Sequence, residues 1–428
     1  MDIVNCASGR DFIERAARLA RHSDSPDHYT RTYLTRAHRA AAAEIAQYMR
    51  DSGMAVRTDA VGSVIGRYEA AAPGARTLLM GSHFDSVRNG GRFDGVMGIL
   101  VPIACVERLH AAGRRLPVAL EVAAFADEEG ARFQTSFLAS RAMVRGSASL
   151  AGLLDRRDAD GVALGDAMRE AGLDPAAADA QRLDPRSLAA YVEVHIEQGP
   201  VLLQEGRALG VVTSIAAGLR YLVKVRGEAG HAGTVPMPMR RDALAAAAEM
   251  VVEAEKRCSA GGSLVGTVGV LRVKDATANV IPGEVEFTLD VRAADGKAHF
   301  AAAREVLASC AAIAKRRGVR VEHAKTHEVP AVPCAPWLQD RIAASIERTL
   351  GDGEARRLPS GAGHDAMILA EVTDVAMMFV RCGAGGVSHN PAETVSAEDA
   401  QAAIDALSDF LEGFEGKSEE RRAKSEEK

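Results

Sequence analysis

One stretch decides the fold of this chain: Gly81-Ser82-His83-Phe84-Asp85-Ser86-Val87, followed by Asn89-Gly90-Gly91-Arg92-Phe93-Asp94-Gly95. It comes after the short apolar run of residues 77–82, which predicts a strand. One histidine and two carboxylates then surround a glycine-rich turn, and these are ligand types that hydrolytic metal centres use. The stretch therefore predicts a buried strand whose end begins a metal centre.

Further apolar runs with the same kind of ending occur along the chain. Residues 118–126, 189–195 and 375–382 are short, contain β-branched side chains and end in Gly, Asp, Glu or His, so they predict strands. Alanine-rich or amphipathic segments such as 34–53 and 95–112 predict helices between them. Alternating strands and helices predict an α/β fold with a central sheet flanked by helices.

The segment from about 219 to 325 follows a different pattern, strand, helix, two strands, helix, strand, with expected bounds of 219–227, 240–257, 264–274, 284–293, 297–317 and 319–324. That order is the ferredoxin-like βαββαβ unit. Candidate metal residues lie both before and after it. We therefore expect an inserted domain at residues 214–326, within a discontinuous catalytic domain of residues 1–213 and 327–428.

Composition excludes several classes of protein. A chain of 428 residues suggests two or three domains, and a formal charge of -6 gives no support for nucleic-acid binding. No apolar run reaches membrane-spanning length and the first residues lack a signal-peptide pattern, so a cytoplasmic protein is expected. The six scattered cysteines predict buried, reduced thiols, and the charged stretch 415–428 predicts a solvated end.

His83 and Asp85 are two residues apart at a strand end, so both side chains leave the same face of the sheet. His83 is a candidate metal ligand, and Asp85 is placed to accept the second ring N–H of that histidine. Asp94, after the turn, is a candidate bridging carboxylate. In isolation, a His-x-Asp pair is more commonly a structural contact, so the prediction depends on the other motifs.

Asp127-Glu128-Glu129 follows the next predicted strand. Neighbouring glutamates point in different directions there, so one can bind metal while the other takes a proton from water as a general base. His195 ends a third strand and His389 lies in the loop after a fourth. The carboxyl ends of strands in open α/β sheets form the crevice that holds ligands, so we expect these residues to meet.

Together, these motifs resemble the hydantoinase/carbamoylase family of dinuclear zinc amidohydrolases, which is related to the aminoacylase and carboxypeptidase group. The match spans nearly the whole chain, in order, through Gly81–Gly95 and the segments Asp127-Glu128-Glu129-Gly130-Ala131-Arg132-Phe133, His195-Ile196-Glu197-Gln198-Gly199-Pro200, Gly230-His231-Ala232-Gly233-Thr234 and Ser388-His389-Asn390-Pro391. The resemblance implies two divalent ions per subunit, Zn or Mn, between which the ligand types cannot choose.

Carried over to this chain, the resemblance assigns Asp94 as the bridge between the two ions. His83 and His195 would complete one ion's site, Glu129 and His389 the other's, and Glu128 would be the general base.

The resemblance implies that the inserted domain is a lid over the active site and a dimerisation domain, which supplies site residues and a homodimer interface. By resemblance, His231 would stabilise the oxyanion, in the neighbouring subunit's site. The expected substrate-binding set is Gln198, Arg220, Asn279, Arg292 and Gly363, with Gln198 and Gly363 coming from the catalytic domain. Arg292 has the planar fork that suits a substrate carboxylate, although alone it would be an ion-paired surface arginine.

The activity that follows is hydrolysis of a ureido or carbamoyl C–N bond in a small substrate that bears a carboxylate. Allantoate, an intermediate of purine breakdown, is preferred because residues 87–91, 213–221 and 358–367 look most like allantoate amidohydrolases. The alternatives are an N-carbamoyl-L-amino-acid hydrolase or β-ureidopropionase, then a metallopeptidase or a catalytically silent binding protein. His364 and Asp365 are expected to hold a loop, and no role is assigned to His22, His28, His38, His110, His299, His323 and His327.

Overall fold

The computed structural model describes residues 7–259, 261, 263–351 and 353–415 of the chain. The chain folds into two compact units: unit 1 is Met1–Thr213, Cys334–Leu358 and His364–Lys428, and unit 2 is Ser214–Pro333 and Pro359–Gly363. The predicted fold class, an α/β sheet flanked by helices together with a ferredoxin-like βαββαβ unit, is confirmed. Cys6 and nearly all of the charged C-terminal stretch lie outside the described residues.

The large sheet has the order β1-β2-β4-β3-β5-β16-β6-β14, and β15 also pairs with β6. Its strands are β1 (Ala55–Thr58), β2 (Val64–Tyr68), β3 (Thr77–His83), β4 (Ala119–Phe125), β5 (Leu188–Ile196), β6 (Leu209–Ile215), β14 (Val332–Pro333), β15 (Arg356–Ser360) and β16 (Val375–Val380).

Parallel pairing holds the centre of this sheet together. β3 lies between β4 and β5, and β16 pairs with the other side of β5, all in the parallel sense. Every residue of β3, β4 and β5 is buried, as expected for strands covered on both faces. The carboxyl ends of β4, β3, β5 and β16 therefore lie at one edge, where the loops that carry the candidate metal residues begin.

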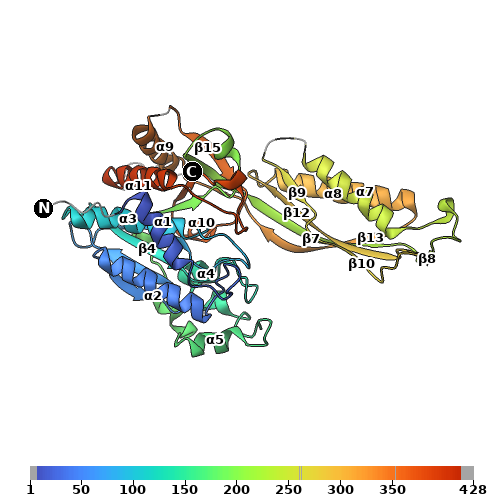
Figure 1. Ribbon diagram of the computed structural model, residues 1–428, viewed down its shortest axis with the longest axis horizontal. Helices are drawn as coiled ribbons and strands as arrows, with labels where there is room; N and C mark the ends of the chain where they lie inside the picture. The colour runs from blue at the N-terminus through green and yellow to red at the C-terminus, as the bar shows by residue number, and fades with distance from the viewer. Residues whose placement is uncertain (1–6, 260, 262, 352, 416–428) are drawn as a thin grey trace. The chain divides into compact units, whose positions relative to one another are not determined.

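Helices cover the sheet of unit 1 (Figure 1). Their bounds are α1 (Gly9–Leu19), α2 (Arg36–Asp51), α3 (Met97–Ala111), α4 (Leu138–Arg145), α5 (Leu164–Glu170), α6 (Val201–Gln204), α9 (Pro336–Leu350), α10 (Ala366–Leu369) and α11 (Ala397–Glu412). α3 is buried over most of its length and contacts β3, β4 and β5, whereas α2 contacts β1 and β2. The sequence pattern predicted both helices to within two residues at each end.

Unit 2 is a five-stranded antiparallel sheet with helices packed on it. Its order is β10-β12-β7-β13, with β9 also paired to β12. The elements are β7 (Ala217–Arg226), β8 (Gly230–His231), α7 (Ala243–Cys258), β9 (Val265–Thr267), β10 (Leu271–Val273), β11 (Val280–Ile281), β12 (Glu284–Ala293), α8 (Ala298–Arg317) and β13 (Arg320–Val329). β8 and β11 form a separate two-stranded ribbon.

Alternation along β12 explains why unit 2 has one apolar and one polar face. Val285, Phe287, Leu289 and Val291 are buried in a core that α7 and α8 share, while the residues between them point to the other face. Cross-strand ion pairs cover that polar face, including the 2.7 Å contact of Arg220 with Asp290.

Three expectations about unit 2 need correction. The single strand expected at 264–274 is two short strands, β9 and β10, because the register against β12 changes between them: Thr267 lies opposite Asp290, and Leu271 lies opposite Phe287. The expected insert ended at residue 326, but unit 2 continues to Pro333, since β13 runs to Val329 and β14 pairs with Ile215 and Ser214. Gly363, expected from the catalytic domain, belongs to unit 2.

Two further features bear on the expected setting of the protein. Within the described part of the chain, no helix combines the length and apolar character needed to cross a bilayer. The cysteines at 105, 258, 310, 334 and 382 are free and buried.

The close contact of α3 with the sheet generates a stability prediction. A Cβ at Gly98 would lie 2.6 Å from Ser82 Cβ and 2.6 Å from the main-chain oxygen of Val194. Gly98→Ala should therefore destabilise the protein by about 1–3 kcal/mol, measured by urea unfolding, because the helix must shift away from β3 and β5. Gly165→Ala is the control: its Cβ would meet Leu154 at 3.4 Å, and equal destabilisation by both variants would contradict the argument.

Candidate metal centre

Candidate ligands come from four neighbouring strand ends. His83 is the last residue of β3, and His195 is the penultimate residue of β5. Glu128 and Glu129 follow β4, and His389 lies in the loop after β16. Since these strands are parallel neighbours, their carboxyl ends bring the side chains together, although they are separated by up to about three hundred positions in the chain.

Asp94 lies at the centre of this cluster and is 5% exposed. One carboxylate oxygen, Oδ1, is 3.3 Å from His195 Nε2 and 3.8 Å from His83 Nε2. The other, Oδ2, is 3.1 Å from His389 Nε2, which in turn is 3.4 Å from Glu129 Oε1. The carboxylate thus presents one oxygen to each of two ligand groups, which is the geometry that a bridging ligand requires.

The hydrogen bonds of the two buried histidines fix which ring nitrogen can bind a cation. His83 Nδ1 is 3.1 Å from the main-chain oxygen of Asp85, and His195 Nδ1 is 2.9 Å from that of Ile196. A carbonyl oxygen only accepts, so both Nδ1 atoms carry the proton. In both histidines the Nε2 atom faces the Asp94 carboxylate, and in the neutral ring this atom carries the lone pair.

Lone pairs and carboxylate oxygens that face one another repel unless a cation or a proton lies between them. His83, Asp94 and His195 form one group, and Asp94, Glu129 and His389 another, whose ligand atoms lie within 4.8 Å of one another. Glu129 Oε1 is buried, and its partner in this group is His389 Nε2 at 3.4 Å. The donor set, nitrogen and carboxylate oxygen only, fits divalent zinc or manganese.

Protonation of a histidine supplies part of the positive charge that this cluster requires. Hydrogen bonds to Asp94 and Glu129 raise the pKa of the half-exposed His389 to about 10. Burial, with a smaller contribution from the charges of His83 and His389, lowers the pKa of His195 to about 4, so this ring is neutral at physiological pH. Neutral imidazole is the form that ligates metal.

Glu128 is 7% exposed and shares a group with His83 and Glu129 in which the ligand atoms lie within 4.8 Å. Burial raises the pKa of Glu128 well above its usual range, and the Glu129 carboxylate raises it further. A carboxylate with a raised pKa can both accept and return a proton near neutral pH.

Asp85, expected to orient His83 with its carboxylate, makes a different set of contacts. Its carboxylate is 3.6 Å from His83 Nδ1, and the closer partner of that nitrogen is the main-chain oxygen of Asp85. The carboxylate oxygens instead accept the backbone N–H groups of Glu128 at 3.0 Å and Glu129 at 3.1 Å. Asp85 therefore ties the loop after β3 to the loop after β4.

Gln198, an expected substrate contact, lies against the metal candidates. Its amide Nε2 donates to Asp94 Oδ1 at 3.2 Å and to Ser388 Oγ at 3.3 Å. It has a φ of 56°, a left-handed conformation that is uncommon for a residue other than glycine. The structure thus brings Gln198 to the bridging candidate.

Glu393 belongs to the site and was missed by sequence reasoning. It is 2% exposed and accepts the N–H groups of Phe93 at 2.9 Å and Asp94 at 3.1 Å, together with the Ser388 hydroxyl at 2.7 Å. A Cβ at Gly91 would lie 2.1 Å from its carboxyl carbon, so this position needs glycine. The only available signal was a carboxylate four residues after His389, because its partners are mostly main-chain groups.

Behind the histidines lies a second buried polar group. The His364 ring centroid is 4.5 Å from that of His195, and Glu193 accepts the hydroxyls of Ser82 and Tyr191. His364 and Asp365, expected to hold a loop, are 1% and 0% exposed and are thus part of the core.

The remaining candidates lie in unit 2. Asp290 pairs with both Arg220 and Arg292, and Arg292 also donates to the Gly361 oxygen at 2.8 Å, in the segment that contains Gly363. These contacts bring the arginines together.

His231 and Asn279 meet through the β8–β11 ribbon, where the Asn279 oxygen accepts the N–H of Ala232. The Gly233 N–H donates to His231 Nδ1 at 3.0 Å. The proton of a neutral His231 is therefore on Nε2, which leaves that atom as a donor.

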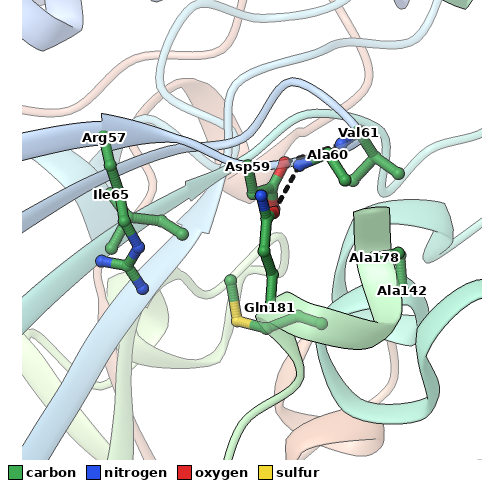
Figure 2. Close-up of a pocket in the computed structure, with 9 residues that line it drawn as sticks. Arg57, Asp59, Ala60, Val61, Ile65, Ala142, Ala178 and Gln181 are labelled. Atoms are coloured by element: carbon green, nitrogen blue, oxygen red, sulfur yellow. Dashed lines mark hydrogen bonds between the residues drawn. The ribbon is translucent and has the colours of Figure 1, made fainter. Parts of the chain in front are cut away.

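A separate small cavity lies beside β1 and β2, and the polar contacts of its lining residues hold the local structure together (Figure 2). Gln181 accepts the Ala60 N–H at 2.7 Å, and Asp59 accepts the N–H groups of Val61 and Ser63. These bonds close the turn between the strands. The lining residues include no histidine or cysteine and supply one carboxylate, so this cavity is a weaker candidate for hydrolytic chemistry.

Known proteins resemble this chain over most of its length. The family model described as peptidase family M20/M25/M40 matches residues 77–413. Allantoate deiminase 1 of Glycine max is 39% identical, over 94% of this chain and 89% of its own length. The N-carbamoyl-L-amino acid amidohydrolase of Geobacillus stearothermophilus is 40% identical, over 88% and 91%. A hydantoinase/carbamoylase family amidase from Burkholderia multivorans superposes with a TM-score of 0.86 at 30% identity, over 95% and 97%.

The contacts of Glu393 generate a prediction about cation binding. Glu393→Ala removes the acceptor that holds the main chain of Asp94, so the affinity of the site for Zn²⁺ should fall about 10–100-fold. Competition with a chromophoric chelator measures this affinity. Glu398→Ala, which removes an exposed carboxylate from the first turn of α11, is the control. Unchanged Zn²⁺ affinity in a folded Glu393→Ala protein would contradict the assignment.

Proposed function

The chain belongs to peptidase family M20/M25/M40, a family of metal-dependent hydrolases, and from this membership we propose that it hydrolyses a ureido C–N bond of allantoate. The products would be ureidoglycine, ammonia and carbon dioxide. One observation carries the proposal: the carboxylate of Asp94 lies between two groups of ligands, with Glu128 beside them.

In the proposed site, two ions of zinc or manganese would be held by His83, His195, Glu129 and His389, with Asp94 between them. Such ions polarise a carbonyl oxygen and lower the pKa of a water to about 7. The raised pKa of Glu128, caused first by burial, suits a group that takes a proton from the attacking water.

The protein's other groups would complete the reaction. Glu128 returns its proton to the leaving nitrogen as the C–N bond breaks, and the carbamate that remains loses carbon dioxide. His231, whose Nε2 carries the proton, donates to the oxyanion of the tetrahedral intermediate. Arg220, Asn279, Arg292, Gln198 and Gly363 would bind the carboxylate and the ureido groups, and Asp290 would hold the two arginines in place.

An N-carbamoyl-L-amino-acid hydrolase is the second candidate. Relatives named for the two substrates match at nearly the same identity, 39% and 40%. Both reactions need the same metals, base and carboxylate-binding residues, and they differ in whether the pocket accepts an apolar side chain or a second ureido group.

We also propose that the protein is a cytoplasmic homodimer whose subunits associate through the inserted unit. Several of its apolar side chains are exposed, among them Met237 at 72%, Met239 at 73% and Val265 at 53%. Large apolar side chains left exposed to water are available to pack in an interface. Five buried free cysteines agree with a reducing compartment.

Glu128→Gln tests the base. The amide cannot accept a proton, so turnover should fall about 10²–10⁴-fold while the metal content measured by elemental analysis stays at two equivalents. Glu170→Gln, at an exposed position in α5, is the control and should keep full activity. A metal-loaded Glu128→Gln enzyme with near-normal turnover would show that another residue is the base.

Steady-state kinetics measured side by side on several compounds test which one is the preferred substrate. We expect the kcat/KM for allantoate to exceed that for every member of a panel of N-carbamoyl-L-amino acids, β-ureidopropionate and a dipeptide. If a carbamoyl amino acid or a dipeptide gives a higher kcat/KM than allantoate, that compound replaces allantoate as the proposed substrate. Fewer than two bound metal equivalents, with no ammonia released from any ureido compound, would indicate a binding protein.

A mixed dimer tests whether His231 acts in the neighbouring subunit. Glu128→Gln and His231→Ala homodimers should each be nearly inactive. If His231 acts across the interface, subunit exchange gives one intact site in each mixed dimer, and activity should rise to about a quarter of wild type. No recovery, in a mixture that sedimentation shows to be dimeric and exchanged, would place His231 in its own subunit's site.

A further inference from the structure

His38, a residue without a role in the proposed reaction, touches both loops that carry the candidate ligands. It lies in the first turn of α2 and is 1% exposed. Its Nε2 is 2.7 Å from the main-chain oxygen of Ala126, directly before Asp127 and Glu128. Its ring stacks on Phe84, between His83 and Asp85, with centroids 4.3 Å apart and an interplanar angle of 25°.

The ring is held firmly in this position. Thr35 caps α2 by accepting the N–H of His38, and the Tyr33 ring packs edge-on against the imidazole with centroids 5.5 Å apart. Ala126 O only accepts, so His38 Nε2 must carry a proton. Burial lowers the pKa of His38 to about 4, so the ring is neutral, and its buried Nδ1 has no hydrogen-bond partner among the described residues.

An unpartnered buried nitrogen argues against simple core packing. An apolar ring would fill the same space without leaving a polar atom unsatisfied. The imidazole ring differs from an apolar ring because it has both a flat face that stacks on Phe84 and an N–H that donates to the main-chain oxygen of Ala126.

Arg31, from the same N-terminal segment, holds the main chain of Phe84 in place. Its Nε donates to the Phe84 oxygen at 2.5 Å, and its own N–H donates to Ser86 Oγ at 2.8 Å. Ser86 N–H donates back to the Arg31 oxygen at 2.9 Å. The loop after β3 is thus fixed through Phe84 and Ser86, and the His38 ring, which stacks on Phe84, also contacts the loop after β4 at Ala126.

We propose that His38 is a positioning residue of the metal centre, which sets the separation of His83 from Glu128 and Glu129 by bonding to Ala126 and stacking on Phe84. It acts together with Asp85, whose carboxylate joins the same two loops from within the site. The proposal rests on the metal centre proposed above.

Two variants remove one contact each. His38→Phe keeps a ring to stack on Phe84 but cannot donate to Ala126, and His38→Gln keeps a donor but loses the stacking ring. His22→Phe is the control: it removes a histidine that pairs with Glu44 of α2 at 2.7 Å, in the same region of the chain.

The test measures cobalt binding to the metal-free proteins. We expect both His38 variants to bind Co²⁺ about 10–100-fold more weakly than wild type, with altered visible absorption bands, because the ligand geometry changes. With allantoate as substrate, kcat should fall more than KM rises. His22→Phe should lower the unfolding midpoint at most, and leave both the cobalt spectrum and the affinity unchanged.

A folded His38 variant with the wild-type spectrum and affinity would overturn the proposal, and if one variant does not fold the other decides. Failure of both to fold would show that His38 is a folding determinant, which also overturns it. Failure of the wild-type protein to bind Co²⁺ would instead refute the metal centre itself.

Discussion

The site depends on one interaction: the Asp85 carboxylate accepts the backbone N–H groups of Glu128 and Glu129. These bonds join the loops that leave two adjacent parallel strands, β3 and β4. They leave the glutamate side chains free to turn toward His83 and His389. With Asp85 in place, the amide N–H groups of both glutamates have an acceptor within a buried region.

This arrangement concentrates charge where water is scarce. Asp94 and Glu128 are almost fully buried, and Glu129 and His83 lie beside them. Burial raises the pKa values of Glu128 and Glu129, which records the cost of ionising them in the absence of a cation. The cluster is therefore built to bind positive charge and not to stabilise the fold, and the surrounding core supplies the stability.

Much of the site followed from local sequence. Glycine-rich turns, histidines and carboxylates directly after apolar runs indicated which residues gather at the sheet edge. Glu393 and His38 did not follow in this way. Glu393 contacts the N–H of Asp94 across 299 positions, and His38 contacts the oxygen of Ala126 across 88. Main-chain N–H and C=O groups are the same in every residue, so such contacts leave no pattern of side chains to detect.

By itself, the sequence determined the class of fold, the strand ends that carry chemistry and the ligand types. Hydrophobic periodicity and turn residues express these properties locally. Only the tertiary structure decided that Asp94 presents one oxygen to each ligand group, that Asp85 holds amides more closely than it holds His83, and that Gly363 belongs to unit 2. These outcomes depend on distances of a few ångströms between segments remote in sequence, which strand pairing and core packing set.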